Sequence, residues 1–151
     1  MATPQTVTEA VDRVIALFNA KAMDLPDGFF DRRTQFVLNG APFETLLGQP
    51  PNDPLVLMLA RGPAGYRFMA KALQHALTGA NVERGDLRTD ADPMTVSTSL
   101  WLSGILRGTG EAFNTVVSVT LTLAASGHVA MAEAVLDEPD LDKLRAARVR
   151  P

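Results

Sequence analysis

Hydrophobic residues in the first part of the chain recur with the period of a helix. Steps of three and four residues, which place side chains on one helical face, separate Val7, Val11, Val14, Phe18 and Ala22. Thr6 and Glu9 have the spacing of a capping box, in which each side chain satisfies the backbone N–H of the other at a helix start. We therefore predict a helix that begins near Val7 and ends near Ala22.

The next segment alternates between turn signals and short apolar runs. The adjacent Phe29 and Phe30, with a proline upstream, predict a short second helix. Residues 34–38 suit a strand, and the Asn39-Gly40 dipeptide that follows is a turn signal. Residues 41–61 are rich in Pro and Gly around one apolar run, which indicates an inserted loop with a short helix.

The most regular apolar stripe begins after Gly62. Its members lie on one helical face and are Tyr66, Met69, Ala70, Leu73, Ala76 and Leu77. Gly79 comes directly after the stripe, where a glycine commonly ends a helix in the left-handed conformation. The pattern predicts a helix that starts at Gly62 and is closed by Gly79.

From residue 82 to about residue 136 the helical period gives way to alternation, which is the period of a strand. Turn signals at Asp92-Pro93, at residues 107–110 and at Ser126-Gly127 divide this region into four antiparallel strands. The clearest strand places on one face Phe113, Thr115, Val117, Val119, Leu121 and Leu123. Pro139 then suits the first turn of a last helix.

Composition narrows the class of protein. With 46% apolar and 21% charged residues, the 151-residue chain fits one globular domain that spans residues 1–151. A net charge of −3 argues against binding to a nucleic-acid backbone, and no uncharged apolar run is long enough to cross a membrane. The first twenty residues lack the pattern of a secretory signal, which favours a cytoplasmic protein.

The sequence offers little support for disulfides, metal sites or the common catalytic motifs. The absence of Cys excludes disulfides and cysteine-ligated metal sites. The acidic residues between 137 and 142 lack the spacing and central glycine of a calcium loop. Nucleotide-binding, esterase and zinc-protease motifs do not occur. We expect no metal and no cofactor.

The order of the elements carries a family resemblance. Helices and one strand, followed by long antiparallel strands, form the α+β pattern in which helices cover one face of a sheet. Through residues 7–24, 29–39, 62–77 and 126–137 the chain resembles the nuclear transport factor two-like superfamily, which includes ketosteroid isomerases and SnoaL-like polyketide cyclases. The resemblance implies a cone-shaped, curved antiparallel sheet covered on one face by about three helices. It also implies a pocket for a small hydrophobic ligand and dimerisation through the outer sheet face.

The predicted faces, placed on that cone, define a candidate pocket. Its lining would comprise Phe36, Leu38, Asn39, Tyr66, Met69, Leu73, Asp86, Thr115, Val117 and Val119. Asn39 could hydrogen-bond a ligand carbonyl, or it could simply form a tight turn with Gly40. The hydroxyl of Tyr66 needs a partner if it is covered, and a ligand could be that partner.

Asp86 leaves two interpretations open. It lies between Arg84 and Arg88 at two-residue steps, so the three side chains would share one strand face. If this face is turned inward, Asp86 could act as a base while the arginines hold an anionic substrate. If it is turned outward, the three form a solvated row of charges, which is favoured because buried charges are costly.

The likeness to ketosteroid isomerases can be checked position by position. Those enzymes use an aspartate base, with a tyrosine and a protonated aspartic acid as donors to the developing oxyanion. Counted along this chain, the tyrosine falls near Ile15 or Ala16, the base near Leu38 and the second acid near Val119. Hydrocarbons neither remove a proton nor donate a hydrogen bond, so we expect no steroid-isomerase chemistry.

Two functions remain open on the sequence. The first is a small-ligand-binding protein of the SnoaL-like type that takes a small apolar or carbonyl-bearing metabolite. The second is a noncatalytic module that forms a homodimer through Trp101, Val116, Met131 and Val135 on the outer sheet face. An open cavity that contains a polar group favours the first function, and a sealed or wholly apolar interior favours the second.

Overall fold

Three helices and a sheet of seven strands make up the part of the chain that the computed structural model describes, residues 4–22, 29–42, 61–91, 94–125 and 128–149. The helices are α1 (Pro4–Asn19), α3 (Gly62–Ala76) and α4 (Glu138–Val149). The strands are β1 (Phe30–Leu38), β2 (Ala41–Pro42), β3 (Leu77–Arg84), β4 (Arg88–Ala91), β5 (Met94–Leu106), β6 (Ala112–Leu123) and β7 (Val129–Val135).

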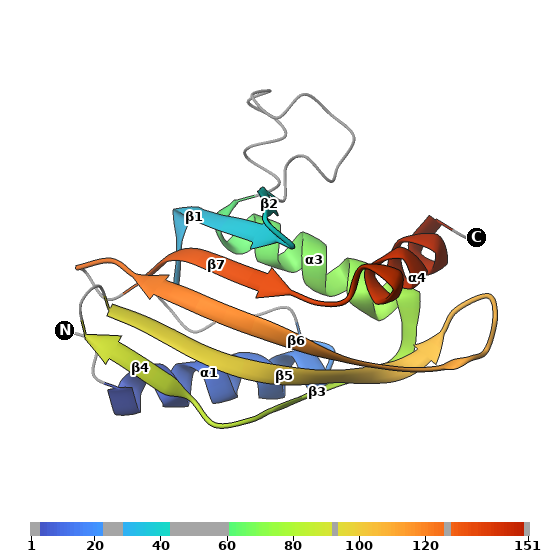
Figure 1. Ribbon diagram of the computed structural model, residues 1–151, viewed down its shortest axis with the longest axis horizontal. Coiled ribbons are helices and arrows are strands. Elements are labelled where there is room, and N and C mark those ends of the chain that lie inside the picture. Colours follow the sequence, from blue (N-terminus) through green and yellow to red (C-terminus); the bar gives the residue numbers. More distant parts are fainter. Residues whose placement is uncertain (1–3, 23–28, 43–60, 92–93, 126–127, 150–151) are drawn as a thin grey trace.

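The strands form one curved sheet in the order β2-β1-β7-β6-β5-β3, and β4 pairs with β5 beside this path (Figure 1). β5 and β6 pair without interruption from Thr95 and Thr122 to Ile105 and Ala112. The α+β class with its curved sheet is confirmed. The sheet is mixed, however, because β1 pairs with β7 in parallel while the other described pairings are antiparallel. A parallel neighbour is reached only through a long connection, and here α3 and five strands separate β1 from β7.

The three helices pack against the inner face of the sheet. α1 and α4 supply Val11 and Leu141 to two clusters of buried side chains, and the inner-facing Val96 and Leu102 of β5 belong to the same two clusters. α3 packs against both β1 and β3, which lie far apart in the strand order. The helices therefore bridge the concave side of the sheet.

Alternation along β6 sorts its side chains between the two faces, as predicted. One face is buried or half-buried and carries Phe113, Thr115, Val117, Val119, Leu121 and Leu123. On the other face Asn114, Val116 and Ser118 are exposed. Because a strand has a period of two, this pattern fixes which residues can reach the interior.

The first helix is displaced from the predicted bounds. α1 runs from Pro4 to Asn19, whereas the prediction placed it from about Val7 to Ala22. The helix ends because Lys21 adopts the left-handed conformation (φ 62°), and the amides of Lys21 and Ala22 donate to the carbonyls of Phe18 (2.9 Å) and Leu17 (2.8 Å). The Asn19 side chain ties this end to β3: its Nδ2 donates to the carbonyl of Val82 (2.9 Å), and its Oδ1 accepts from the amide of Val82 (2.8 Å).

The end of α3 also differs from the prediction. The helix ends at Ala76, and Leu77 immediately begins β3, so Gly79 does not cap the helix. Gly79 has a φ of 67° and lies where the pairing of β3 with β5 shifts register between Thr78 and Asn81. A glycine with positive φ suits such a bulge, so the same residue type signals a different backbone feature.

Other predicted elements are redistributed. Phe30 begins β1 and Phe29 forms a bend before it, so neither belongs to a short helix, and the rest of that predicted helix lies outside the described residues. The region after α3 holds five strands where the prediction had four, because β3 starts at Leu77 and β4 forms a separate short strand. The insertion expected at 41–61 lies mainly in residues 43–60, outside the described part of the chain. The predicted last helix is confirmed as α4.

Hydrogen bonds of Thr34 and close packing of Gly62 anchor the start of β1. Thr34 is fully buried, and its hydroxyl donates to the carbonyl of Val129 (2.5 Å) and accepts from the amide of Asp31 (2.9 Å). These bonds lie where the β1–β7 register shifts between Phe30 and Gln35, so they satisfy groups that the ladder leaves free. Gly62 at the start of α3 packs on this bulge, since a Cβ there would lie 2.7 Å from the Asp31 carbonyl oxygen.

Asn39 anchors the other end of β1. Its φ is 50°, and its amide hydrogen-bonds to the chain that enters α4: Oδ1 accepts from the Leu136 amide (2.8 Å), and Nδ2 donates to the Leu136 carbonyl (2.9 Å). Nδ2 also lies 3.2 Å from Glu138 Oε1. Asn tolerates the left-handed region better than most residues, so one side chain serves the turn and joins it to the start of α4.

We predict that Asn39→Ala lowers the free energy of unfolding by about 2 kcal/mol, because two backbone groups of Leu136 lose their partners. Asn39→Asp keeps the acceptor and loses the donor, so its effect should be intermediate. Urea denaturation followed by circular dichroism measures both. Equal stability of Asn39→Ala and the natural chain would contradict the anchoring role.

Candidate functional site

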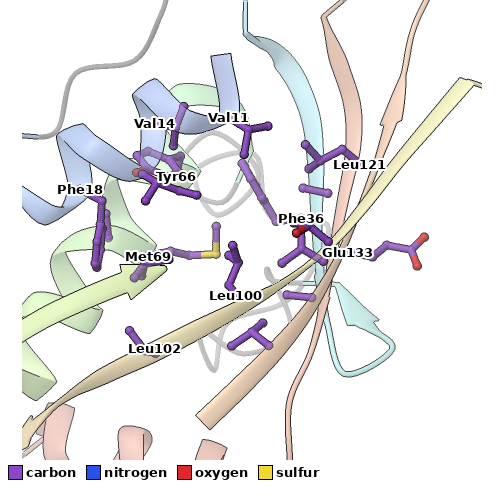
Figure 2. Close-up of a pocket in the computed structure, with 18 of the residues that line it drawn as sticks. Val11, Val14, Phe18, Phe36, Tyr66, Met69, Leu100, Leu102, Leu121 and Glu133 are labelled. Atoms are coloured by element: carbon purple, nitrogen blue, oxygen red, sulfur yellow. The ribbon is translucent and has the colours of Figure 1, made fainter. Parts of the chain in front are cut away.

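A cavity of about 260 Å³ lies between α1, α3 and the inner face of the sheet. In Figure 2, Val11 and Val14 from α1, Met69 from α3 and Leu100 from β5 surround a common space. Residues with aliphatic or aromatic side chains make up almost the whole lining, and these are Val11, Val14, Ile15, Phe18, Phe29, Phe30, Phe36, Val37, Leu38, Tyr66, Met69, Ala70, Leu73, Val82, Leu87, Val96, Leu100, Leu102, Val117, Val119, Leu121, Ala132 and Ala134.

Most residues of the predicted pocket lie around this cavity. Its lining includes Phe36, Leu38, Tyr66, Met69, Leu73, Val117 and Val119. The prediction omitted the wall supplied by α1 and by β5. The apolar stripe of α1 and the alternation of β5 were visible signals, but they indicate only a buried face. They do not reveal whether a neighbour fills the space beyond it.

Thr115, Asn39 and Asp86 do not line the cavity, which corrects the prediction. Thr115 is buried, but its hydroxyl donates to Asp140 Oδ2 of α4 (2.8 Å). It shares a face with Val117, yet α4 covers its end of the strand. Asn39 holds the turn to the start of α4.

Asp86 lies on an exposed connection rather than on a strand. Residues 85–87 separate β3 from β4, so Arg84 and Arg88 belong to different strands. Arg84 pairs with Asp12 of α1, and this hydrogen-bonded pair lowers the pKa of the Asp12 carboxyl. Asp86 itself is exposed, which agrees with the outward interpretation of this residue. The ion pair ties α1 to β3 near the surface, where such a pair contributes little stability.

Aromatic rings form one wall of the cavity. The ring centroids of Phe29 and Phe30 are 4.7 Å apart, and those of Phe30 and Phe36 are 5.2 Å apart, both in edge-to-face arrangements. Phe30 also faces Tyr66 at 5.6 Å. These separations lie in the range that aromatic pairs prefer, so the wall is held by its own contacts.

Two residues of the lining, Thr98 and Tyr66, carry hydroxyl groups, but almost all of the cavity surface is hydrocarbon. The hydroxyl of Thr98 donates its proton to the carbonyl oxygen of Gly85 (3.2 Å). Tyr66 has no hydrogen-bond partner among the residues that the structure describes, and burial raises its pKa to about 12. Glu133 of β7 borders the cavity, but Figure 2 shows that its carboxylate is directed away from it.

The outer face of the sheet has a different character. Trp101, Val116 and Val135 have exposed fractions of 56%, 58% and 55%, and Ile105 is also exposed. Trp101 lies directly opposite Val116 in the β5–β6 register. Met131, which the sequence also assigned to this surface, is half-buried.

The described part of the chain contains neither a cluster of metal ligands nor a membrane-spanning helix. Within the described ranges, His, Asp and Glu side chains form no group of three that could hold a metal ion. None of the described helices is both long enough and apolar enough to cross a bilayer.

Solved structures with the same fold are found at low sequence identity. A SnoaL-like polyketide cyclase from Agrobacterium tumefaciens is 17% identical, with a TM-score of 0.64 over 95% of this chain and 98% of that chain. A nuclear transport factor two-like protein of unknown function from Exiguobacterium sp. 255-15 is 17% identical, with a TM-score of 0.60 over 85% and 98%. A protein with a ketosteroid isomerase-like fold from Catenulispora acidiphila is 12% identical, with a TM-score of 0.62 over 99% and 100%.

The fold is thus that of the nuclear transport factor two-like superfamily, as the sequence indicated. No protein-family profile matches the sequence, and no curated protein matches it significantly. At such identities the similarity establishes the fold and leaves the chemistry to the residues themselves.

We predict that the protein does not isomerise a 5-ene-3-ketosteroid. The count along the sequence places the tyrosine, the base and the second acid of steroid isomerases near Ile15 or Ala16, Leu38 and Val119. Ile15, Leu38 and Val119 line the cavity, whereas Ala16 is exposed. Loss of one oxyanion donor alone typically costs about 10²- to 10³-fold in turnover. Ultraviolet absorbance should show no rate above that of buffer. Turnover that disappears in Asp86→Asn would show that a relocated base exists.

Proposed function

We propose that the protein binds a small, uncharged organic molecule in the cavity between its helices and its sheet. The observation that carries this proposal is a cavity of about 260 Å³ whose lining is almost entirely hydrocarbon. An apolar cavity of about 150 Å³ is large enough to bind benzene, so this one has room for a molecule of about two rings. The space left in the interior favours this function over that of a purely structural core, in which side chains would fill it.

Binding, rather than acid–base catalysis, fits the titratable groups. Tyr66 and Glu133 are the titratable residues of the described lining, and the carboxylate of Glu133 is directed away from the cavity. With its pKa raised to about 12, the Tyr66 hydroxyl stays protonated at neutral pH and cannot serve as a base. It can still donate a hydrogen bond.

One neighbour with the same fold supports a small-molecule role. The ketosteroid isomerase-like protein from Catenulispora acidiphila was solved in complex with trimethylamine. That complex concerns a protein of 12% identity, so it supports the proposal only through the fold. The character of the ligand here has to follow from this chain's own lining.

Filling the cavity should abolish binding. Val14 lines the cavity from α1, whereas Ala16 on the same helix is exposed. We predict that Val14→Phe weakens binding of the neutral two-ring fluorescent dye 6-propionyl-2-(dimethylamino)naphthalene by at least about tenfold, while Ala16→Phe leaves it unchanged. Dye fluorescence, which rises in apolar surroundings, measures both. Equal binding by the two variants would place the dye elsewhere.

The second candidate function is homodimerisation through the outer sheet face. Trp101, Ile105, Val116 and Val135 are exposed on β5, β6 and β7, and no described helix covers them. Large contiguous apolar patches are uncommon on monomers. A two-fold dimer would cover the patch with an identical patch, so one surface suffices for both partners. This association is compatible with ligand binding because the cavity lies on the opposite face.

Light scattering should therefore give the mass of a dimer at micromolar concentration. Trp101→Ala should shift the population toward monomer, since large aromatic side chains often dominate interface energies. Lys71→Ala, at an exposed position on α3, serves as the matched control. A monomer mass for the natural chain would exclude this function and leave the cavity proposal intact.

A further inference from the structure

A ligand of the cavity needs a route into the space between the helices and the sheet. We infer that α1 is a gate that hinges at Asn19 and is latched by the ion pair between Asp12 and Arg84. Ligand passes between α1 and residues 84–87 when this gate opens. The gate rests on the proposed function, to which it adds the path and the control of ligand exchange.

α1 differs from the other walls of the cavity in how it is attached. The strands are joined to one another by backbone hydrogen bonds, and α3 continues directly into β3 at Leu77. Among the described residues, the backbone hydrogen bonds of α1 stay within the helix and the turn that ends it. Side-chain contacts therefore hold α1 to the sheet, so the helix can move without breaking the backbone pairing of the sheet.

The end of α1 at Asn19 is the hinge because it is firmly anchored. The Asn19 amide forms two hydrogen bonds with the backbone of Val82. Beside it, Gln74 Nε2 of α3 donates to the carbonyl of Phe18 (3.0 Å). These bonds are partly buried, where a hydrogen bond is stronger than in water. A helix that tilts about this end keeps them while its first half moves away from the sheet.

The latch lies nearer the start of the helix. Asp12 precedes Asn19 by two helical turns, about 10 Å along the helix axis. Its carboxylate accepts hydrogen bonds from Nε and Nη2 of Arg84, the second at 3.0 Å, which is a bidentate arrangement. Arg84 is held in turn by a bond from its Nη1 to the carbonyl of Gly85 (3.0 Å). The Asp12 side chain is 51% exposed, so water and salt compete for the pair and allow it to break.

The latch stands beside residues that line the cavity. Leu87, on the connection that follows Arg84, is one of them, and it packs in the same apolar cluster as Val11 of α1. Figure 2 shows Val11 and Val14 above the common space. An outward tilt of the first half of α1 therefore separates Val11 from Leu87 and opens the cavity between them. Because Val7 and Val11 are buried in the closed state, the open state is a minor one.

A gate changes the rates of ligand exchange and leaves the affinity alone. When the open state is a minor one, a weaker latch raises the open fraction, and with it the association and dissociation rate constants by the same factor. The dissociation constant stays the same because the free and the bound protein are both mainly closed. A residue that only contacts the ligand would change the dissociation constant instead.

Stopped-flow fluorescence of 6-propionyl-2-(dimethylamino)naphthalene measures both rate constants and so tests the latch. We expect Asp12→Asn to raise both at low salt by roughly 1.5- to fivefold, the size of an exposed ion pair, with an unchanged dissociation constant. Arg13→Gln removes a charge from the neighbouring exposed position of α1 and should exchange the dye like the natural chain. Concentrated sodium chloride should bring the natural chain to the rates of Asp12→Asn, because salt screens the pair.

A reversible crosslink tests the movement itself. The chain contains no Cys, so the double variant Asp12→Cys/Arg84→Cys offers two thiols to a short bis(methanethiosulfonate) reagent. The crosslinked protein should nearly cease to exchange the dye, and dithiothreitol should restore exchange because it cleaves the crosslink. Asp12→Cys alone, treated with the same reagent, should exchange the dye rapidly. Equally fast exchange with and without the crosslink would show that ligand enters by another path.

The outcomes separate the gate from the function on which it rests. If the dye binds but Asp12→Asn and Arg13→Gln exchange it at the same rate, the latch is wrong and the apolar site stands. If the dye does not bind the natural chain, the binding function fails and the gate fails with it. Thermal unfolding provides the control: Asp12→Asn should melt close to the natural chain, because an exposed pair contributes little stability. A much lower melting temperature would show that the pair holds the fold together and is no latch.

Discussion

The uninterrupted pairing of β5 with β6 is the constraint on which both faces of the molecule depend. From Thr95 and Thr122 to Ile105 and Ala112, each residue of one strand faces one residue of the other. Since side chains alternate, Leu100 and Leu102 line the cavity while Trp101 between them is exposed. A slip of one residue would exchange the two sets and turn Trp101 inward. The helices hold this register by covering only the inner face, and their span across the curved sheet leaves the space that forms the cavity.

Alternation and helical period predicted much of this arrangement because each reports which face of an element is buried. They do not show which neighbouring element covers each position of that buried face. Thr115 and Val117 have the same parity on β6, yet α4 covers the first while the second borders the cavity. Val11 and Val14 were recognised as the apolar side of a helix, but periodicity cannot distinguish a filled core from an empty one. The position of α4 depends on contacts far apart in sequence, so only the folded chain reveals it.

The roles of Asn39 and Gly79 were likewise determined by contacts that the sequence does not show. Asn39 was ambiguous in the sequence because an Asn-Gly turn and a ligand contact require the same residue type. The deciding partner, Leu136, lies 97 residues further along the chain. Gly79 was assigned to a helix end for an analogous reason, since positive φ serves caps and bulges alike. In both cases the local signal was sound, and a long-range contact determined what it meant.

The same distribution of polar groups limits what the cavity can do. The neighbours include a polyketide cyclase and a ketosteroid isomerase-like fold, but a fold transfers no reaction without the groups that perform it. Proton abstraction next to a carbonyl needs a base as well as a donor. In the described lining the raised pKa of Tyr66 keeps its hydroxyl from acting as a base. Any proton transfer from a molecule in the cavity would therefore require a base that the described lining does not supply.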